Sequence, residues 1–356
     1  MDDGGQRRNV LDRRGFRETI AVYEGFTSEN MISYEKKYQR YKSLIDQKIH
    51  SCVRKNEPVS LYEPVKYVLS AGGKRMRPLL IVLSCEAVGG TMNEALNAAV
   101  AIEVLHNFTL VHDDIMDNAE SRRGRATVHV RWDSNVAILV GDELVALAYR
   151  ELLRTKSKAI AQVADVFTEG VVEVCEGQAY DKEFEMLHDV SIDDYLLMIA
   201  KKTGKLFSVS SEIGGLIGGG TEREIRALRS YGTYIGRAFQ IQDDLLDIIA
   251  DEKEFGKTIG GDIVEGKKTF LLIKAYERAQ GKDKKLITAI IKNKGTSKKN
   301  IPLVKEIYER YDIIQLAKQS IDKDIRQANL QLEKLRDTSA REMLQWFSNM
   351  VLNRQF

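Results

Sequence analysis

Two short acidic motifs with the same spacing, Asp-Asp-Xaa-Xaa-Asp, are the residues in this sequence best suited to chemistry. They occupy residues 113–117 and 243–247, far apart in the chain. In a helix, the first and last aspartates of each motif stand one turn apart, so their carboxylates share a face. Two such carboxylates repel each other unless a cation lies between them. Mg²⁺ suits them, because it binds through one or two carboxylates together with substrate phosphates. The motifs therefore predict a magnesium site for a phosphorylated substrate.

The neighbours of the two motifs distinguish a metal site from the solvated acidic end of a helix. For one motif alone, the solvated end is the commoner arrangement. Here both motifs adjoin apolar residues, including Phe108 and Ile115 around the first and Leu245 within the second. Unpaired carboxylates are costly in such partly buried surroundings. Glu103 and His106 continue the row of the first motif along its helix. We expect a single metal site formed by two facing helices.

Basic residues that could bind phosphate groups lie in several places along the sequence. Residues 72–78 read Gly-Gly-Lys-Arg-Met-Arg-Pro, and the glycines allow a tight turn that points two cations at one anion. Arginine binds phosphate bidentately, whereas lysine acts as a point charge. Any one of these residues would ordinarily be a surface charge, but beside two acidic helices they together predict two polyphosphate sites. The candidates are Lys74, Arg77, Arg122, Arg123, Lys202, Thr203, Lys257 and Lys267.

Long helices must position these residues. Apolar residues recur at three- and four-residue spacing, alternating strand patterns are scarce, and each of the four prolines can stand near the start of a helix. Thr91 with Glu94 and Thr221 with Glu224 have the spacing of capping boxes. The pattern predicts an all-α bundle of long helices around a central cavity. The expected helices span residues 31–54, 62–71, 78–88, 92–118, 134–154, 158–187, 192–217, 222–250 and 268–280, and residues 127–132 are expected to form a loop.

Composition and charge restrict the class of protein. The 356 residues include 54 basic and 52 acidic side chains, and a net charge of +2 gives no reason to expect a nucleic-acid partner. The three cysteines lack metal-ligand spacing, which is typical of a reduced, cytoplasmic compartment. No apolar run is long enough for a transmembrane helix. Residues 1–33 are expected to be a mobile N-terminal extension, and residues 34–356 a single domain.

Several motifs follow one another in a recognisable order. They are Gly-Gly-Lys-Arg-Met-Arg-Pro, then Glu-Val-Leu-His-Asn-Phe-Thr-Leu-Val-His-Asp-Asp-Ile-Met-Asp with a trailing Arg-Arg-Gly, then Lys-Lys-Thr-Gly, and then Phe-Gln-Ile-Gln-Asp-Asp-Leu-Leu-Asp with Gly-Lys and Gly-Lys-Lys-Thr after it. In order and spacing they resemble the short-chain polyprenyl (isoprenyl) diphosphate synthases, and most of all geranylgeranyl diphosphate synthase. The resemblance covers residues 34–316, most of the chain.

This resemblance implies an isoprenoid-synthase fold of long antiparallel helices around a deep cavity, in a homodimer. It also implies how the substrates and the metal are bound. Isopentenyl diphosphate would be held by Lys74, Arg77, His106 and Arg123. The allylic diphosphate (dimethylallyl, geranyl or farnesyl) would be held by Arg122, Lys202, Thr203, Gln240, Lys257 and Lys267. About three Mg²⁺ ions would be bound, two by Asp113 and Asp117 and a third by Asp243, with Asp244 and Asp247 supporting through waters.

The implied reaction is a trans-prenyl transfer driven by electrostatics. Mg²⁺ and the basic residues stabilise the charge that develops on the departing diphosphate. The double bond of isopentenyl diphosphate then attacks the allylic cation, a proton is lost to the departing diphosphate, and apolar walls keep water away. The residues expected to carry catalysis are Asp113, Asp117, Asp243 and Lys202.

The length of the product is expected to depend on the floor of the cavity. Phe108 lies about one helical turn before the first aspartate, with Thr109 beside it and Leu105 another turn deeper. One aromatic ring next to a small residue resembles the archaeal type of geranylgeranyl synthase, which favours a C20 product. A C15 product, made by a farnesyl diphosphate synthase, is the alternative.

Other classes of protein share part of this pattern. A terpene cyclase has the fold and the first aspartate motif, but it does not need Lys74 and Arg77 for a second diphosphate. A catalytically silent regulatory subunit should have lost motif residues, and none is missing here. A head-to-head squalene-type synthase and an acidic helical scaffold are weaker alternatives. Asp181, with Gln178, is a further candidate for the cavity wall near Lys202.

Overall fold

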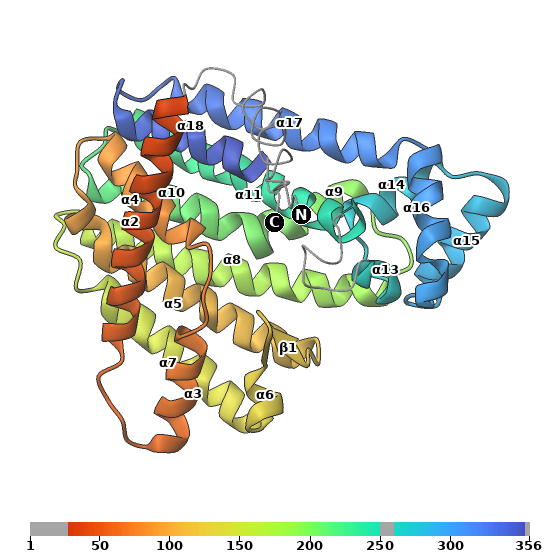
Figure 1. The fold of residues 1–356 in the computed structure, drawn as a ribbon, viewed down its shortest axis with the longest axis horizontal. Coiled ribbons are helices and arrows are strands. Elements are labelled where there is room, and N and C mark those ends of the chain that lie inside the picture. Colours follow the sequence, from red (N-terminus) through yellow and green to blue (C-terminus); the bar gives the residue numbers. More distant parts are fainter. Residues whose placement is uncertain (1–27, 250–259, 353–356) are drawn as a thin grey trace, which may run out of the picture.

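The computed structural model describes residues 28–249 and 260–352, and over these residues it is almost entirely helical (Figure 1). The predicted all-α fold is therefore confirmed. The helices are α2 (Ser28–Cys52), α3 (Val59–Leu69), α4 (Met76–Ala87), α5 (Met92–Met116), α6 (Val128–Arg131), α7 (Ser134–Leu152), α8 (Ile160–Met186), α9 (Ile192–Ile199), the π-helix η1 (Ala200–Gly204), α10 (Lys205–Ile217), α11 (Glu222–Ile249), α13 (Gly261–Val264), α14 (Phe270–Arg278), α15 (Gly281–Lys292), the 3₁₀-helix η2 (Lys298–Asn300), α16 (Ile301–Arg310), α17 (Ile313–Leu332) and α18 (Ser339–Leu352). Two short strands, β1 (Ser121–Arg122) and β2 (Arg125–Ala126), pair as an antiparallel hairpin.

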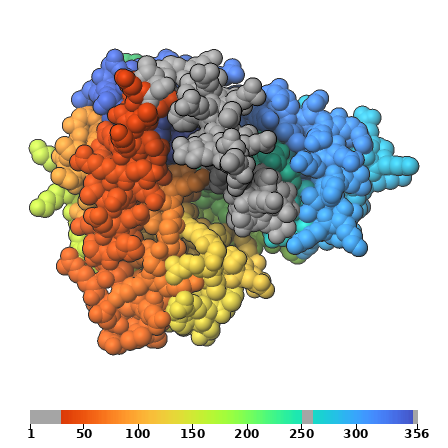
Figure 2. Space-filling view, viewed as in Figure 1, coloured from red at the N-terminus to blue at the C-terminus, as the bar shows by residue number. Residues whose placement is uncertain are grey.

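The core of the bundle lies around α10, which packs against α4, α5, α8 and α11. Almost every side chain of α4 and α10 is buried, including Ile81, Phe207 and Ile213. The buried polar side chains of α10 are small serines and Glu212, which is paired with Arg229, so the helix can lie in the interior. At the periphery, α7 packs on α5 and α17 packs on α11. Figure 2 shows α2 and α3 (red and orange) at one end of the molecule and α15 and α16 (lighter blue) at the other, while α18 packs back against α2 and α4.

Capping boxes start two of the long helices at their predicted positions. The amide and hydroxyl of Thr91 donate to Glu94 at the start of α5. At the start of α11, Thr221 donates to Glu224 in the same way, and the Glu224 amide donates back to the Thr221 hydroxyl. These bonds satisfy amide groups that the first turn of a helix leaves without a partner.

Three local predictions were wrong. The helix expected from residue 62 begins at Val59 and contains Pro64, because Pro58 already accepts the first helical amides. Residues 127–132 contain the helical turn α6 rather than a loop, since Thr127 acts as its N-cap and is itself anchored to the Ala119 carbonyl. The helix expected over 192–217 is interrupted by η1, whose extra residue per turn leaves no mark on the apolar spacing.

The predicted N-terminal extension is only partly described. Residues 28–33 form the first turns of α2, and residues 1–27 lie outside the described part of the chain. Within the described ranges, no helix combines the length and the apolar character that a membrane span requires.

Candidate active site

Both aspartate motifs line one large cavity, as the sequence predicts. The cavity has a volume of about 1300 Å³ and is bounded mainly by α5, α8, η1 and α11. Of the residues proposed as ligands, it is lined by Asp113, Asp117, Asp243, Asp244, Asp247, Arg77, His106, Arg122, Arg123, Lys202, Thr203, Gln240 and Lys267. Lys74 lies outside this lining, in the loop before α4, and Lys257 lies outside the described residues.

The first motif occupies the C-terminal end of α5. Asp113 is in its last turn, and Asp117 is the C-cap residue. The Oδ1 atom of Asp113 lies 3.2 Å from the Lys202 ammonium, and Asp117 accepts a hydrogen bond of 2.5 Å from Lys182. Each of these carboxylates therefore faces a side-chain cation across the cavity. Lys182 was missed by the sequence analysis, because its partner is on a different helix.

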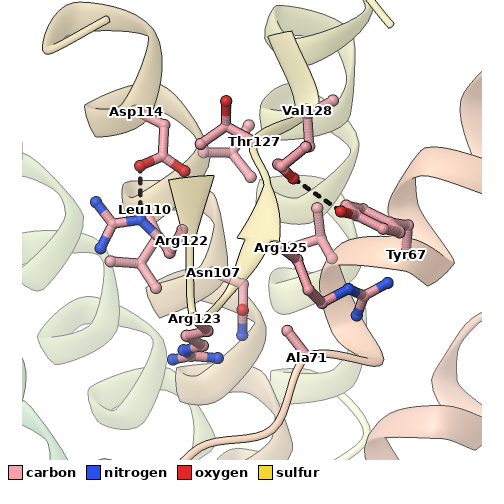
Figure 3. Close-up of a pocket in the computed structure, with 13 residues that line it drawn as sticks. Tyr67, Ala71, Asn107, Leu110, Asp114, Arg122, Arg123, Arg125, Thr127 and Val128 are labelled. Carbon is pink, nitrogen blue, oxygen red and sulfur yellow. Dashed lines mark hydrogen bonds and ion pairs between the residues drawn. The ribbon is translucent and has the colours of Figure 1, made fainter. Parts of the chain in front are cut away.

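The middle aspartate of the first motif has a different partner. Asp114 is almost completely buried and accepts a 2.6 Å bond from Arg122 Nε (Figure 3). Arg122 comes from strand β1, and its guanidinium also lies 4.0 Å from Asp113. Asp114 therefore holds the hairpin against α5 and fixes the place of Arg122 at the cavity wall.

The donor set of the first motif fits Mg²⁺. Asp113 Oδ1 is buried and makes no hydrogen bond of good geometry, although Lys202 is nearby. Such an atom is a good ligand for a cation. Among the described residues, no three acidic, histidine or cysteine side chains come close enough to hold a metal by themselves. Mg²⁺ binds through one or two carboxylates and completes its coordination with waters and substrate phosphates, so Asp113 and Asp117 could hold it.

In the second motif, Asp244 is tied to three hydrogen-bond donors of the protein. Tyr195 donates to it at 2.6 Å, the Gln240 amide at 2.9 Å and the Phe270 backbone N–H at 3.1 Å. Burial, and then the negative charge of Asp262, raise the pKa of Asp244 to about 7. Asp244 is thus placed to orient Gln240 and the start of α14.

Asp247 lies beside a carboxylate that the sequence analysis did not single out. The backbone N–H of Asp262 donates to Asp247 Oδ2 at 3.2 Å. Burial and Asp262 raise the pKa of Asp247 to about 7. Asp262 is also the main cause of the raised pKa of Lys267, whose ammonium lies 3.8 Å away. Acids and a lysine are therefore concentrated at one end of the cavity.

The π-helix η1 carries Lys202 and Thr203 into the cavity. Lys202 donates to Asp181 at 2.6 Å, and Thr203 donates to the Gln240 side-chain oxygen at 2.8 Å. Burial raises the pKa of Asp181, but the charges of Lys202 and Lys267 lower it by more. The net pKa of Asp181 therefore lies below its usual value. The prediction that Asp181 and Gln178 line the cavity near Lys202 is confirmed. Single π-turns within helices are frequent at functional sites.

Two of the three cations predicted for isopentenyl diphosphate, Arg77 and Arg123, lie near His106 in the cavity wall. Arg77 lies 3.2 Å from His106 Nε2 and stacks on the ring of Phe207 at 4.6 Å. Burial, followed by the charges of Arg77 and Arg123, holds the pKa of His106 well below its ordinary value. This favours the neutral ring, in which Nε2 would accept from Arg77, and Nδ1 lies 3.5 Å from the Thr109 hydroxyl. A neutral donor beside two arginines suits an anion such as a diphosphate.

Arg123 is held in an unusual backbone conformation. The strands β1 and β2 are joined by Arg123 and Gly124, with φ angles of 53° and 71°. A two-residue hairpin of type I′ requires positive φ at both positions and favours Asn or Gly there. An arginine at such a position is strained, and strain of this kind is often found at functional sites. On the next strand, Arg125 turns away from Asp114 toward Tyr67 (Figure 3).

Glu103 does not extend the metal-binding row, contrary to the sequence-based expectation. It is buried and accepts a 2.6 Å bond from Arg75, which also bonds to Asp46. Arg75 has a φ of 50°, and this turn points it into the protein while Arg77 points into the cavity. In the 72–78 segment, Arg75 therefore stabilises the fold, whereas Arg77 belongs to the site.

The predicted floor of the cavity is only partly exposed to it. Phe108 and Thr109 line the cavity, whereas Leu105 is fully buried outside its lining. The Phe108 ring packs edge-on against His112, with 4.8 Å between centroids. His112 in turn lies directly against Gly141 of α7, where an added Cβ would be 2.0 Å from Nε2. A glycine at that position leaves the imidazole room to support Phe108.

The chain is similar to known proteins over most of its length. A family model described as polyprenyl synthetase matches residues 58–311. The short chain isoprenyl diphosphate synthase of Methanothermobacter thermautotrophicus is 40% identical over 318 residues, which cover 89% of this chain and 97% of that protein. The geranylgeranyl diphosphate synthase of Sulfolobus acidocaldarius is 44% identical over 257 residues, covering 71% of this chain and 78% of that protein.

The fold is also that of a solved structure. The geranylgeranyl pyrophosphate synthetase from Pyrococcus horikoshii OT3 matches with a TM-score of 0.85 and 41% identity, over 91% of this chain and 100% of that one. The predicted isoprenoid-synthase bundle and the resemblance noted in the sequence are confirmed. On the combined grounds of the family match, the identity to these relatives and the shared fold, this chain belongs to the polyprenyl synthetase family.

Proposed function

We propose that the protein is a short-chain trans-prenyltransferase that joins isopentenyl diphosphate to allylic diphosphates and makes geranylgeranyl diphosphate. The observation that carries this proposal is the lining of one cavity by two aspartate motifs and two separate groups of cations. Two anionic groups can therefore be bound side by side. A terpene cyclase binds only one diphosphate and would not need the Arg77–His106 pair.

The two substrates would occupy opposite sides of the cavity. The diphosphate of isopentenyl diphosphate would contact Arg77, His106 and Arg123. The allylic diphosphate would contact Arg122, Lys202, Thr203, Gln240 and Lys267, between the two aspartate motifs. The contacts of Thr203 with Gln240 and of Gln240 with Asp244 orient these groups before substrate enters. Such preorganised polar groups are effective because they need not reorganise during the reaction.

Mg²⁺ would be held by Asp113 and Asp117 on one side and by Asp243 on the other, with Asp244 and Asp247 in support. Bound there, it supplies positive charge to the diphosphate group that leaves. The side chains of Lys202, Lys267 and Arg122 stabilise the same developing charge. In the transfer, the allylic C–O bond breaks, a C–C bond forms to isopentenyl diphosphate, and the departing diphosphate takes up the proton that is lost.

A C20 product is supported by the names of relatives and by the cavity floor. The relatives from Sulfolobus acidocaldarius and Pyrococcus horikoshii are both named for geranylgeranyl diphosphate (pyrophosphate). In this chain, Phe108 lines the cavity, and its ring packs against His112. A farnesyl product remains the alternative, because one ring does not by itself set a cavity depth.

We also propose that the enzyme is a homodimer joined through α7 and α8. Large apolar side chains on these two helices are exposed in the single chain, with Ile138 45%, Leu139 58% and Val172 46% accessible. An interface between two copies through these helices would cover such exposed apolar groups. Sedimentation equilibrium should give twice the chain mass of 40.3 kDa, and a monomer at micromolar concentration would contradict this assignment.

Replacing one carboxylate tests the proposed function. Asp113→Ala should lower turnover by at least about a hundredfold, because it removes a charge at the point where the leaving group is stabilised. Asp337→Ala is a suitable control, since Asp337 is exposed, precedes α18 and bonds, among the described residues, only to Arg341 in the first turn of that helix. Near-normal turnover of Asp113→Ala would refute the site. A loss shared by both variants would point to a general defect.

A further inference from the structure

A lysine on α8 contacts the first aspartate motif directly. Lys182 donates from Nζ to Asp117 Oδ1 at 2.5 Å, to the Met116 carbonyl at 3.2 Å and to Glu185 at 2.8 Å. It lines the cavity, and 29% of its side chain is exposed. Its neighbour Asp181 pairs with Lys202. Two successive residues of α8 thus present opposite charges to the site.

The position of Lys182 conflicts with metal binding at Asp117. The ammonium group occupies one oxygen of the carboxylate at hydrogen-bonding distance, where a metal ion would have to bind. Lysine carries a compact, strongly hydrated point charge, so its attraction to a carboxylate resembles that of a small cation. Both cations cannot use the same lone pairs fully. A metal ion that binds Asp117 must therefore displace Lys182 or share the carboxylate with it.

We propose that Lys182 is a built-in counter-cation that competes with Mg²⁺ for Asp117 and so raises the Mg²⁺ concentration needed to load the first motif. The inference rests on the proposed role of Asp117 as a metal ligand. When the site is empty, Lys182 reduces the repulsion between Asp117 and the other acids nearby. When Mg²⁺ and diphosphate bind, Lys182 moves toward its second partner, Glu185.

Glu185 sets how strongly Lys182 is held on Asp117. The two carboxylates share one ammonium group, and Glu185 is about half exposed, with 52% of its side chain accessible. Removing Glu185 leaves Asp117 as the sole carboxylate on Lys182. Removing Lys182 frees Asp117 entirely. Substitutions at the two positions should therefore shift the Mg²⁺ requirement in opposite directions.

Two other roles for Lys182 make different predictions. If the lysine only caps the C-terminal end of α5, through the Met116 carbonyl and the helix dipole, its removal lowers stability without changing the Mg²⁺ requirement. If it binds the diphosphate directly, its removal weakens diphosphate binding and raises the apparent Mg²⁺ requirement.

The experiment titrates Mg²⁺ into the purified full-length protein at a fixed concentration of inorganic pyrophosphate. Binding is followed by calorimetry and by the midpoint of thermal unfolding, so no turnover is needed. Lys182→Gln should lower the half-saturating Mg²⁺ concentration about two- to fivefold, the range expected for a partly exposed ion pair. Glu185→Gln should raise it, and the double variant should behave like Lys182→Gln. Lys182→Arg, which keeps the charge, should remain close to the wild type.

Lys37→Gln is a matched control for the loss of one lysine. Lys37 has 31% of its side chain exposed and bonds to Glu86 at 3.0 Å, but it lies on α2, outside the cavity lining. Its variant should leave the Mg²⁺ titration unchanged. An unchanged or increased Mg²⁺ requirement in Lys182→Gln overturns the proposal.

A further variant separates this inference from the proposed function. Asp117→Asn should abolish most of the response to Mg²⁺. If it does, and Lys182→Gln behaves like the wild type, only the role of Lys182 is wrong. If Asp117→Asn leaves the titration unchanged, Asp117 is not a metal ligand and the proposed site itself fails.

Discussion

Arg123 offers a test in which stability and substrate binding should change in opposite directions. Its backbone has a φ of 53° in a turn that favours Asn or Gly, while its guanidinium lines the cavity on the side of His106. Arg123→Asn keeps a residue that tolerates this backbone conformation and removes the cation. We expect a protein that is slightly more stable and that binds isopentenyl diphosphate poorly.

The gain in stability follows from the backbone strain and from charge repulsion. The left-handed conformation costs a residue other than Gly or Asn about 1 kcal/mol. Burial lowers the pKa of Arg123. Glu103 opposes this shift, Arg75 and Arg122 add to it, and the net pKa lies below the usual value, so the charge is disfavoured in the fold. Relief of about 1 kcal/mol corresponds to a rise of about 1–2 °C in the unfolding midpoint of a chain of this length.

The loss in binding follows from one charge-assisted hydrogen bond. Such a bond contributes about 1.5–3 kcal/mol, and each 1.4 kcal/mol is a factor of ten in affinity. The KM for isopentenyl diphosphate should therefore rise about 10- to 100-fold, while the KM for the allylic diphosphate should change little. Initial rates at saturating concentrations of the other substrate measure both constants.

Two variants of the same hairpin serve as controls. In Gly124→Ala the new Cβ meets no atom within 4 Å, but φ is 71°, so stability should fall by about 1 kcal/mol with both KM values unchanged. Arg125→Asn removes an equal charge that stacks on Tyr67 outside the cavity, and KM should again be unchanged. A normal KM for isopentenyl diphosphate in Arg123→Asn would refute the assignment, and a lower unfolding midpoint would refute the strain argument.

Three further predictions concern the floor, a buried ion pair and proton release. Phe108→Ala should lengthen the products beyond C20, because it removes the ring that blocks the growing isoprenoid tail. Mass spectrometry of the products would show an unchanged distribution if another residue forms the floor of the cavity. Glu103→Ala should lower the free energy of unfolding by about 3 kcal/mol, because it leaves the buried Arg75 with one carboxylate fewer. Urea denaturation measures this loss, and a loss below about 1 kcal/mol would contradict the prediction. Binding of Mg²⁺ with pyrophosphate should release protons near pH 7 and fewer at pH 8.5. The pKa values of Asp244 and Asp247 are about 7 before binding, and the metal favours their ionised forms. Calorimetry in buffers of different ionisation enthalpy measures the release, and an equal release at pH 7 and pH 8.5 would contradict this prediction.

The sequence was sufficient to predict those residues of the site that are related by helical spacing. Acids one turn apart on apolar helices had to share a face, and the structure places both motifs in one cavity. The glycine-rich segment before α4 was likewise predictable as a turn that carries cations. Local signals of this kind act within a few residues, so one chain is enough to recognise them.

Partners on different helices could not be predicted in the same way. The contact of Lys182 with Asp117 depends on how α8 lies against α5, and the pair of Arg75 with Glu103 depends on a positive φ at Arg75. The π-turn η1 inserts one residue without changing the apolar pattern on either side. Such features arise from packing and not from local propensity, and they decide which cations face the cavity.

Product formation from labelled isopentenyl diphosphate tests the central claim most directly. The purified protein is incubated with Mg²⁺, labelled isopentenyl diphosphate and, in separate reactions, dimethylallyl, geranyl or farnesyl diphosphate. Label should enter a C20 diphosphate with each allylic primer, and Asp113→Ala should form almost none. If no label enters a longer diphosphate with any of the three primers, the proposed prenyl transfer is wrong. Conversion of the allylic diphosphate alone to a hydrocarbon would also contradict the proposed transfer.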